Sequence, residues 1–207
     1  MIVAGCDVGS LTAKAYIMNE KGGLAGEIIP VQSTPTDSAR RVMEKALKSA
    51  RLNFSDLDVC CSTGYGRYEI PFAQMNMSEI SCHGLGAFHV DSGIRTVIDI
   101  GGQDCKVILI DANGNVRDFI MNDKCAAGTG RSLEILARTI GVKLEELGRL
   151  AVKSKKPINI SNKCSIFMEL EVLGHLYARK KLKHIACGIA DAVAQVAQAR
   201  GVPRAQV

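Results

Sequence analysis

Short apolar runs bounded by glycine or asparagine occur within the first 30 residues and again after residue 95. Runs of this length between turn residues are typical of buried strands. Longer stretches with apolar positions at helical spacing predict helices over roughly 36–51, 131–140, 165–180 and 185–200, and another short run predicts a strand over 57–62. Thr36 or Asp37 is the expected cap of the first helix, and Ser161 or Asn162 of the third.

The strand-rich segments are two copies of one pattern. A shift of 92 residues aligns them without a gap, and each copy has the order strand, Asp-x-Gly turn, strand, glycine turn, strand. The identical pairs are Asp7 with Asp99, Gly9 with Gly101, Lys14 with Lys106, and Gly22 with Gly114. The sequence therefore predicts two equivalent hairpins.

An Asp-x-Gly turn suits phosphate binding. Gly9 and the pair Gly101-Gly102 let the backbone approach a ligand closely, and successive N–H groups in a tight turn form an anion-binding nest. An aspartate at the end of the strand can hold a metal ion or order a water molecule. One such turn is usually an ordinary hairpin, but a second copy favours a pair of hairpins that grip a phosphate chain with its Mg²⁺.

The cysteines suggest a second kind of chemistry. None of the eight belongs to a CxxC pair, which argues against a zinc ribbon or a thioredoxin motif. In a cytosolic chain disulfides are disfavoured, so most thiols are expected to be small buried apolar groups. Cys125 and Cys164, 39 residues apart, each precede or open a predicted helix. The loop around Cys125 is not a P-loop, because GxxxxGK[ST] is absent from the sequence.

Composition narrows the class of protein. The chain has 207 residues with 47% hydrophobic and 23% charged residues, which suits a globular protein of one or two small lobes. The net charge of +5 is mild, aromatics are 4% and Trp is absent, so we expect no nucleic-acid surface. We find no targeting leader and no apolar run of 18 residues, and therefore expect a cytoplasmic protein without a membrane helix.

Several stretches of the sequence together resemble a known family. They are residues 7–14, 63–67, 79–83, 99–104, 121–131 and 160–171. With these stretches the sequence is similar to activators of 2-hydroxyacyl-CoA dehydratases, also called CoA-substrate-specific enzyme activases, and to the ATPase subunits of benzoyl-CoA reductases, all of the BadF/BadG/BcrA/BcrD type. The resemblance covers about residues 2–200, and its most specific stretch is Met121–Arg131.

The resemblance implies an α/β fold of the actin-like ATPase class, which includes acetate kinase, sugar kinases, Hsp70 and actin. It implies duplicated sheet-and-helix lobes, here a first lobe over 1–92 with one phosphate hairpin and a second over 93–207 with the other hairpin and the cluster cysteines. Family members continue for several dozen residues with a further strand and an adenosine loop, so we expect the C-terminal part of the fold to be missing.

The resemblance also implies site residues. Ser10, Thr12 and Lys14 are expected to line one hairpin, and Gln103 and Asp104 the other, with Gln103 positioning the attacking water. Asp7 and Asp99 are expected to serve Mg²⁺ or its waters. The remaining expected nucleotide contacts are Gly9, Leu11, Ala13, Gly101 and Gly102. Cys125 and Cys164 of two subunits are expected to hold one [4Fe–4S] cluster in a homodimer.

The implied function is ATP-dependent donation of one electron to a 2-hydroxyacyl-CoA dehydratase or benzoyl-CoA reductase, coupled to ATP hydrolysis and supplied by ferredoxin or flavodoxin. Two alternatives stay open. A small-molecule kinase of the same fold would not need the two cysteines, and a non-hydrolysing iron–sulfur or interaction module would not need the adenosine loop.

Overall fold

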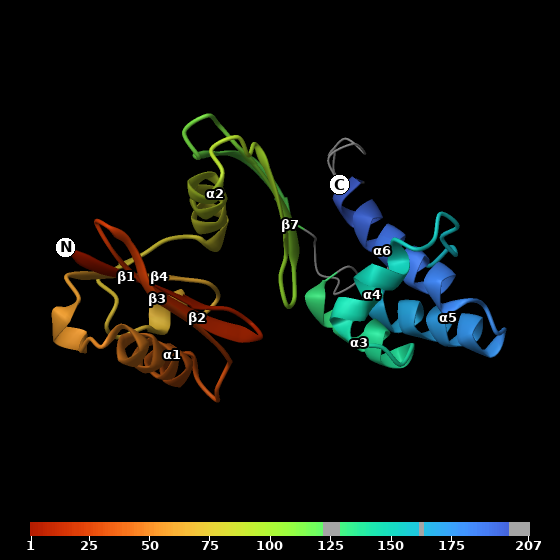
Figure 1. Cartoon of the computed structure of the whole chain (residues 1–207), viewed down its shortest axis with the longest axis horizontal. Helices are drawn as coiled ribbons and strands as arrows, with labels where there is room; N and C mark the ends of the chain where they lie inside the picture. The colour runs from red at the N-terminus through yellow and green to blue at the C-terminus, as the bar shows by residue number, and fades with distance from the viewer. Residues whose placement is uncertain (122–128, 162–163, 199–207) are drawn as a thin grey trace. The chain divides into compact units, whose positions relative to one another are not determined.

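The computed structural model describes residues 1–121, 129–161 and 164–198. The chain forms two compact units, Met1–Gly86 and Ala87–Val207. Helix α2 (Glu79–Val90) includes the boundary between them. Figure 1 shows the elements along the chain.

The first unit is built on a five-stranded sheet in the order β3-β2-β1-β4-β5. Its strands are β1 (Ile2–Val8), β2 (Thr12–Asn19), β3 (Gly22–Pro30), β4 (Val59–Thr63) and β5 (Met75–Asn76). The first three strands form an antiparallel meander, whereas β4 runs parallel to β1 and to β5. Two 3₁₀ turns, Phe54–Asp56 and Arg67–Glu69, lie in the connections.

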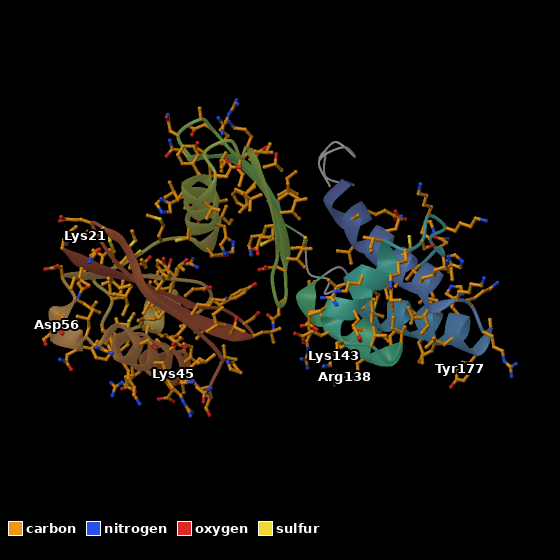
Figure 2. All side chains as sticks on the ribbon, in the orientation of Figure 1. Lys21, Lys45, Asp56, Arg138, Lys143 and Tyr177 are labelled. Atoms are coloured by element: carbon orange, nitrogen blue, oxygen red, sulfur yellow. The ribbon has the colours of Figure 1, made fainter. Side chains whose placement is uncertain are left out.

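Helix α1 (Pro35–Ala50) covers one face of this sheet (Figure 1). Its buried side chains, which include Val42 and Leu47, join the inward residues of β1 and β2 in one apolar core. The opposite side of the helix is charged, and Figure 2 shows Lys45 directed away from the sheet. The core thus fixes the position of β1 and β2, and with them the turn that joins the two strands.

The described residues of the second unit form, after the end of α2, a three-stranded antiparallel sheet and four helices. The sheet has the order β6-β7-β8, with β6 (Thr96–Ile100), β7 (Cys105–Ile110) and β8 (Val116–Met121). The helices are α3 (Gly130–Thr139), α4 (Leu144–Ala151), α5 (Ser165–Tyr177) and α6 (Leu182–Gln198). They share a core in which Leu136, Met168 and Ile189 are almost completely buried.

The expected strands and helices are present, but both predicted caps are wrong. The N-cap of α1 is Thr34, whose hydroxyl oxygen accepts a hydrogen bond from the Asp37 backbone N–H at 3.1 Å. Pro35 is the first residue of the helix, a position that proline favours. The residue before α5 is Cys164, which makes no side-chain cap bond. Helices α2 and α4 were not predicted.

We predict that Gly188→Ala destabilises the second unit. A Cβ on Gly188, within α6, would overlap the backbone carbonyl of Ile158. That segment is fixed to the same helix because the Ile158 N–H donates to the His184 carbonyl at 3.2 Å. The free energy of unfolding should fall by about 2 kcal/mol, as for an overpacked core, measured by chemical denaturation.

The matched control is Gly174→Ala in α5, where an added Cβ would meet nothing within 4 Å. This change should be neutral or raise the free energy of unfolding by about 0.5–1 kcal/mol, because alanine is the better helix former. Equal effects of the two substitutions on the free energy of unfolding would show that the close approach of α6 to Ile158 does not limit the residue at position 188.

Candidate functional site

The two sequence repeats fold into hairpins with the same register. Asp7 pairs with Lys14 across β1 and β2, and Asp99 pairs with Lys106 across β6 and β7. Each turn is closed by the N–H of the glycine two residues after the aspartate. The Gly9 N–H donates to the Thr12 carbonyl at 3.0 Å, and the Gly101 N–H donates to the Asp104 carbonyl at 2.8 Å.

The equivalence extends along both hairpins. The register between the second and third strands shifts once in each unit. The shift lies between Ile17 and Met18 in one unit and between Leu109 and Ile110 in the other, which are equivalent positions of the repeat. The second turn of each copy contains a glycine with positive φ, Gly22 at 127° and Gly114 at 82°. The repeat found in the sequence is therefore a repeat of backbone structure.

The first hairpin carries a partly exposed ion pair. The Lys14 ammonium donates to Asp7 Oδ2 at 2.8 Å, and the Lys14 side chain retains 42% of its accessible surface. Glycine at position 9 suits the tight turn, because a Cβ there would lie 3.2 Å from the Thr12 carbonyl oxygen. Ser10 and Leu11 are half-buried and Ala13 is buried. An exposed lysine beside a glycine turn can exchange its carboxylate partner for a phosphate oxygen.

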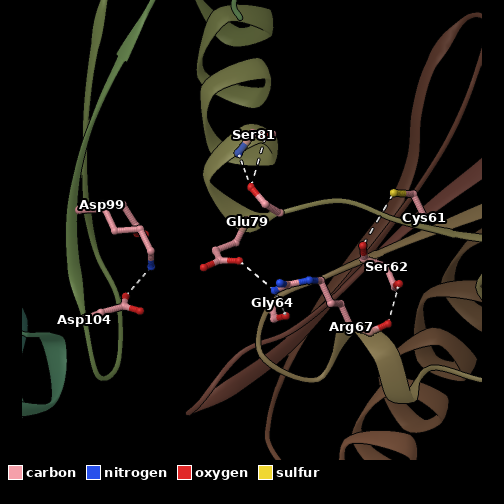
Figure 3. Close-up of polar contacts among 10 residues, drawn as sticks. Cys61, Ser62, Gly64, Arg67, Glu79, Ser81, Asp99 and Asp104 are labelled. Carbon is pink, nitrogen blue, oxygen red and sulfur yellow. Dashed lines mark hydrogen bonds and ion pairs between the residues drawn. The ribbon is translucent and has the colours of Figure 1, made fainter. Parts of the chain in front are cut away.

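The glycine-rich loop after β4 packs against this hairpin. The Gly66 N–H donates to the Val8 carbonyl at 3.0 Å. Gly64 has a φ of 84°, and a Cβ on it would overlap Asp7 Oδ1 and the Val8 carbonyl. The Arg67 guanidinium donates to the Gly64 carbonyl at 3.0 Å and to Glu79 Oε2 at 3.3 Å, which ties the loop to the start of α2 (Figure 3).

Thr63 is a further polar residue at this hairpin, beyond those expected from the sequence. It lies beside Asp7 in the parallel pairing of β1 and β4. Its hydroxyl oxygen is buried and finds no hydrogen-bond partner within the described residues. Buried hydroxyls normally have partners, so this group suits a ligand or a metal-bound water near Asp7. Only its position at the end of a strand, before a glycine, could have indicated it.

The second hairpin carries a buried cluster of charges. The Lys106 ammonium donates to Asp104 Oδ1 at 2.6 Å and lies 3.7 Å from Asp99 Oδ2. The Lys106 side chain is 3% exposed. Figure 3 shows Asp104 near the turn of the β6–β7 hairpin and Asp99 farther along the strand, with the contact to Asp104 drawn. Gln103, in the same turn, is exposed, while Gly101 and Gly102 are half-buried.

A backbone hydrogen bond joins this hairpin to the helical part of the unit. The Gly130 N–H, at the first residue of α3, donates to the Gly101 carbonyl at 2.8 Å. A Cβ on Gly130 would lie 3.1 Å from that oxygen, so glycine permits the close approach. The preceding Thr129 is completely buried. The start of α3 is thus fixed on the turn that contains Gln103.

The candidate cluster ligands are placed only in part. Cys125 lies outside the described residues. Cys164 is half-buried and immediately precedes α5, so its thiol stands at a helix N-terminus, where the helix dipole favours a negative ligand. Within the described ranges, no group of three or more metal-ligating side chains is found.

Of the other thiols in the described residues, three are buried in the core and three are half-buried. Burial raises the pKa of Cys6 to about 12 and that of Cys60 to about 11, with smaller effects of neighbouring thiols. Cys105 is buried, and desolvation raises its pKa as well. Half-buried Cys187 donates to the Ser154 carbonyl at 3.3 Å. Groups that resist ionisation are poor metal ligands, which agrees with the packing role expected for them.

No helix among the described residues is long and apolar enough to cross a membrane. The chain is 41% identical to the 2-hydroxyisocaproyl-CoA dehydratase activator of Clostridioides difficile over 94% of its length and 73% of the relative. It is 39% identical to the (R)-2-hydroxyglutaryl-CoA dehydratase activating ATPase of Acidaminococcus fermentans, over 92% of the chain and 73% of the relative.

The solved structure of the Clostridium difficile activator with bound ADPNP superposes with a TM-score of 0.87 and 39% identity, over 99% of this chain and 78% of the other. The predicted actin-like α/β fold is thereby confirmed. A model of the BadF/BadG/BcrA/BcrD ATPase family matches residues 4–201. Because this match spans nearly the whole chain, the protein belongs to that family of ATPases, as the resemblance predicted.

Proposed function

We propose that this protein is an ATP-driven, one-electron donor that activates a 2-hydroxyacyl-CoA dehydratase or a benzoyl-CoA reductase. Membership of an ATPase family and identity of about 40% to two proteins named as dehydratase activators support this function. The observation that carries the proposal is the pair of equivalent Asp-x-Gly hairpins, in a chain that also places Cys164 at the start of a helix.

The hairpins supply the groups that a nucleotide phosphate chain needs. Backbone N–H groups over residues 10–14 and 102–104 are the proposed phosphate contacts, together with the side chains of Ser10, Thr12 and Lys14, while the N–H groups of Gly9 and Gly101 close the turns. Asp104 shapes the second turn, since its backbone carbonyl accepts from Gly101. We assign these contacts to the nucleotide because the two turns match in register and in closing hydrogen bond.

The carboxylates of Asp7 and Asp99 are the proposed partners of Mg²⁺ or its water molecules. Both are partly accessible, with 22% and 19% of the side-chain surface exposed, and oxygen is the ligand that Mg²⁺ prefers. Mg²⁺ bound with the nucleotide would neutralise developing phosphate charge. The exposed amide of Gln103 is free of the core and suits the task of orienting the attacking water.

Cys125 and Cys164 of two subunits are the proposed ligands of one [4Fe–4S] cluster in a homodimer. The accessible thiol of Cys164 at the N-terminus of α5 fits a thiolate ligand. Such a cluster would supply the one-electron carrier. The chain contributes the thiolates, the dipoles of the adjoining helices and the partial exclusion of water, all of which influence a reduction potential.

The remaining assignments follow from the same proposal. The partner is a dehydratase or reductase, the electron source is ferredoxin or flavodoxin, and the compartment is the cytoplasm. We propose that residues 1–92 and 93–207 correspond to the two lobes of the actin-like fold, each with one phosphate hairpin. ATP can alter electron transfer only if it binds two conformations of the protein with different affinity.

We predict that Gln103→Ala lowers the kcat of ATP hydrolysis by about a hundredfold, as expected for the loss of one positioned hydrogen-bonding group. KM for ATP should change little, because the amide is expected to contact the attacking water rather than the ground-state nucleotide. Steady-state phosphate release measures both constants. Gln195→Ala, on the exposed side of α6, is the control. Hydrolysis by Gln103→Ala at the parental rate would refute the assignment.

We predict that Cys164→Ser removes the cluster while leaving nucleotide binding intact. Loss of one thiolate per subunit takes away two of four ligands by symmetry. Iron and sulfide analysis after anaerobic purification, with a nucleotide titration, measures both properties. Cys187→Ser is the matched control, because a serine hydroxyl can keep the hydrogen bond to the Ser154 carbonyl. A full complement of iron in Cys164→Ser would place the ligand elsewhere.

We predict that the dimer depends on the cluster, since each subunit contributes only two of its four ligands. Anaerobic size-exclusion chromatography should show the dimer weakened or lost once a chelator or air has removed the iron. The same column run with untreated protein is the control. A monomer that contains four irons would contradict a cluster shared between subunits.

A further inference from the structure

Lys106 is a charged side chain enclosed in the second unit. It is 3% exposed, whereas its counterpart Lys14 in the first hairpin is 42% exposed. A lysine is rarely buried to this degree without anionic partners, because desolvation disfavours its charge. The carboxylates of Asp104 and Asp99 lie within 4 Å of its ammonium group and offset that cost.

The two hairpins differ at one position that accounts for this contrast. The residue whose carbonyl closes the turn is Thr12 in the first hairpin and Asp104 in the second, at equivalent positions of the repeat. The second turn therefore has two carboxylates where the first has one. Lys106 directs its ammonium group to the additional carboxylate, at 2.6 Å, and lies farther from the aspartate that both repeats share.

We propose that Lys106 is a positioning residue that acts as a fixed cation between Asp99 and Asp104, so that the second hairpin binds a divalent cation only together with nucleotide phosphates. The nucleotide part of this statement rests on the proposed function. Two carboxylates at one turn would otherwise attract Mg²⁺ by themselves, since hard cations favour clustered carboxylate oxygens.

The distances from Lys106 to the two aspartates indicate that the two carboxylates have different roles. At 2.6 Å, Lys106 makes a charge-assisted hydrogen bond to Asp104. At 3.7 Å from Asp99 it exerts an electrostatic effect but makes no hydrogen bond. Asp104 is thus held in the turn, and Asp99 stays partly exposed and oriented by charge. Phosphate oxygens that bring Mg²⁺ with them can then complete the coordination at Asp99.

Mn²⁺ binding without nucleotide tests this role directly. The titration uses electron paramagnetic resonance of free Mn²⁺ and the full chain with the variants Lys106→Gln, Lys106→Met and Lys106→Arg. Loss of the positive charge in the Gln and Met variants should tighten Mn²⁺ binding by about tenfold. Lys106→Gln retains a hydrogen-bond donor for Asp104, so it still tests the loss of charge if the Met variant fails to fold. Circular dichroism checks folding.

Two further variants separate charge from structure and locate the site. Lys106→Arg keeps the charge and should bind Mn²⁺ as weakly as the parent. The double variant Lys106→Gln/Asp99→Asn should lose the tightened site, because it lacks the accessible carboxylate. Unchanged Mn²⁺ binding in both charge-removing variants would overturn the proposal. So would equal tightening in Lys106→Arg, because the effect would then come from altered packing.

ATP hydrolysis by the parent protein is measured separately. Absence of hydrolysis with tightened Mn²⁺ binding in Lys106→Gln would refute the proposed function but support the charge effect. Hydrolysis by the parent with no change in Mn²⁺ binding would refute only the role of Lys106.

Discussion

The cross-strand pairing of an aspartate with a lysine, next to a glycine turn, is the constraint on which the rest of the structure depends. It occurs once in each unit, as Asp7 with Lys14 and Asp99 with Lys106. The pairing holds a carboxylate at the end of a strand while the glycine keeps the backbone open beside it. The sheet, its core and the loop at Gly64 serve to fix that arrangement.

Much of this architecture could be predicted from the sequence, because the repeat preserves both spacing and residue type. A gapless shift of 92 residues implies that the two hairpins have the same strand register. The turn-closing hydrogen bonds of Gly9 and Gly101 join equivalent positions of the repeat, as this register requires. The difference between the two lysines could not be predicted. The sequence shows Asp104 at the position of Thr12, but periodicity does not record that Lys106 turns to this carboxylate and is buried with it.

The errors had local causes. The cap of α1 is Thr34, two or three residues before the expected Thr36 or Asp37, because Pro35 favours the first helical position and the apolar spacing does not mark it. Helix α2 could not be predicted because its apolar residues show little helical periodicity. The role of Thr63 was missed because a threonine that ends a strand looks ordinary until its buried hydroxyl proves to have no partner within the described residues.

The contact between Gly130 and Gly101 joins the second hairpin to α3. The turn with Gln103 accepts a hydrogen bond from the first residue of α3, at 2.8 Å, and glycine at position 130 makes that approach possible. Cys125, a proposed cluster ligand, lies shortly before Gly130 in the sequence. The repeat alone gives two similar turns, and this bond distinguishes the second, because the carbonyl of Gly101 is held by the helix that follows the cysteine in the sequence.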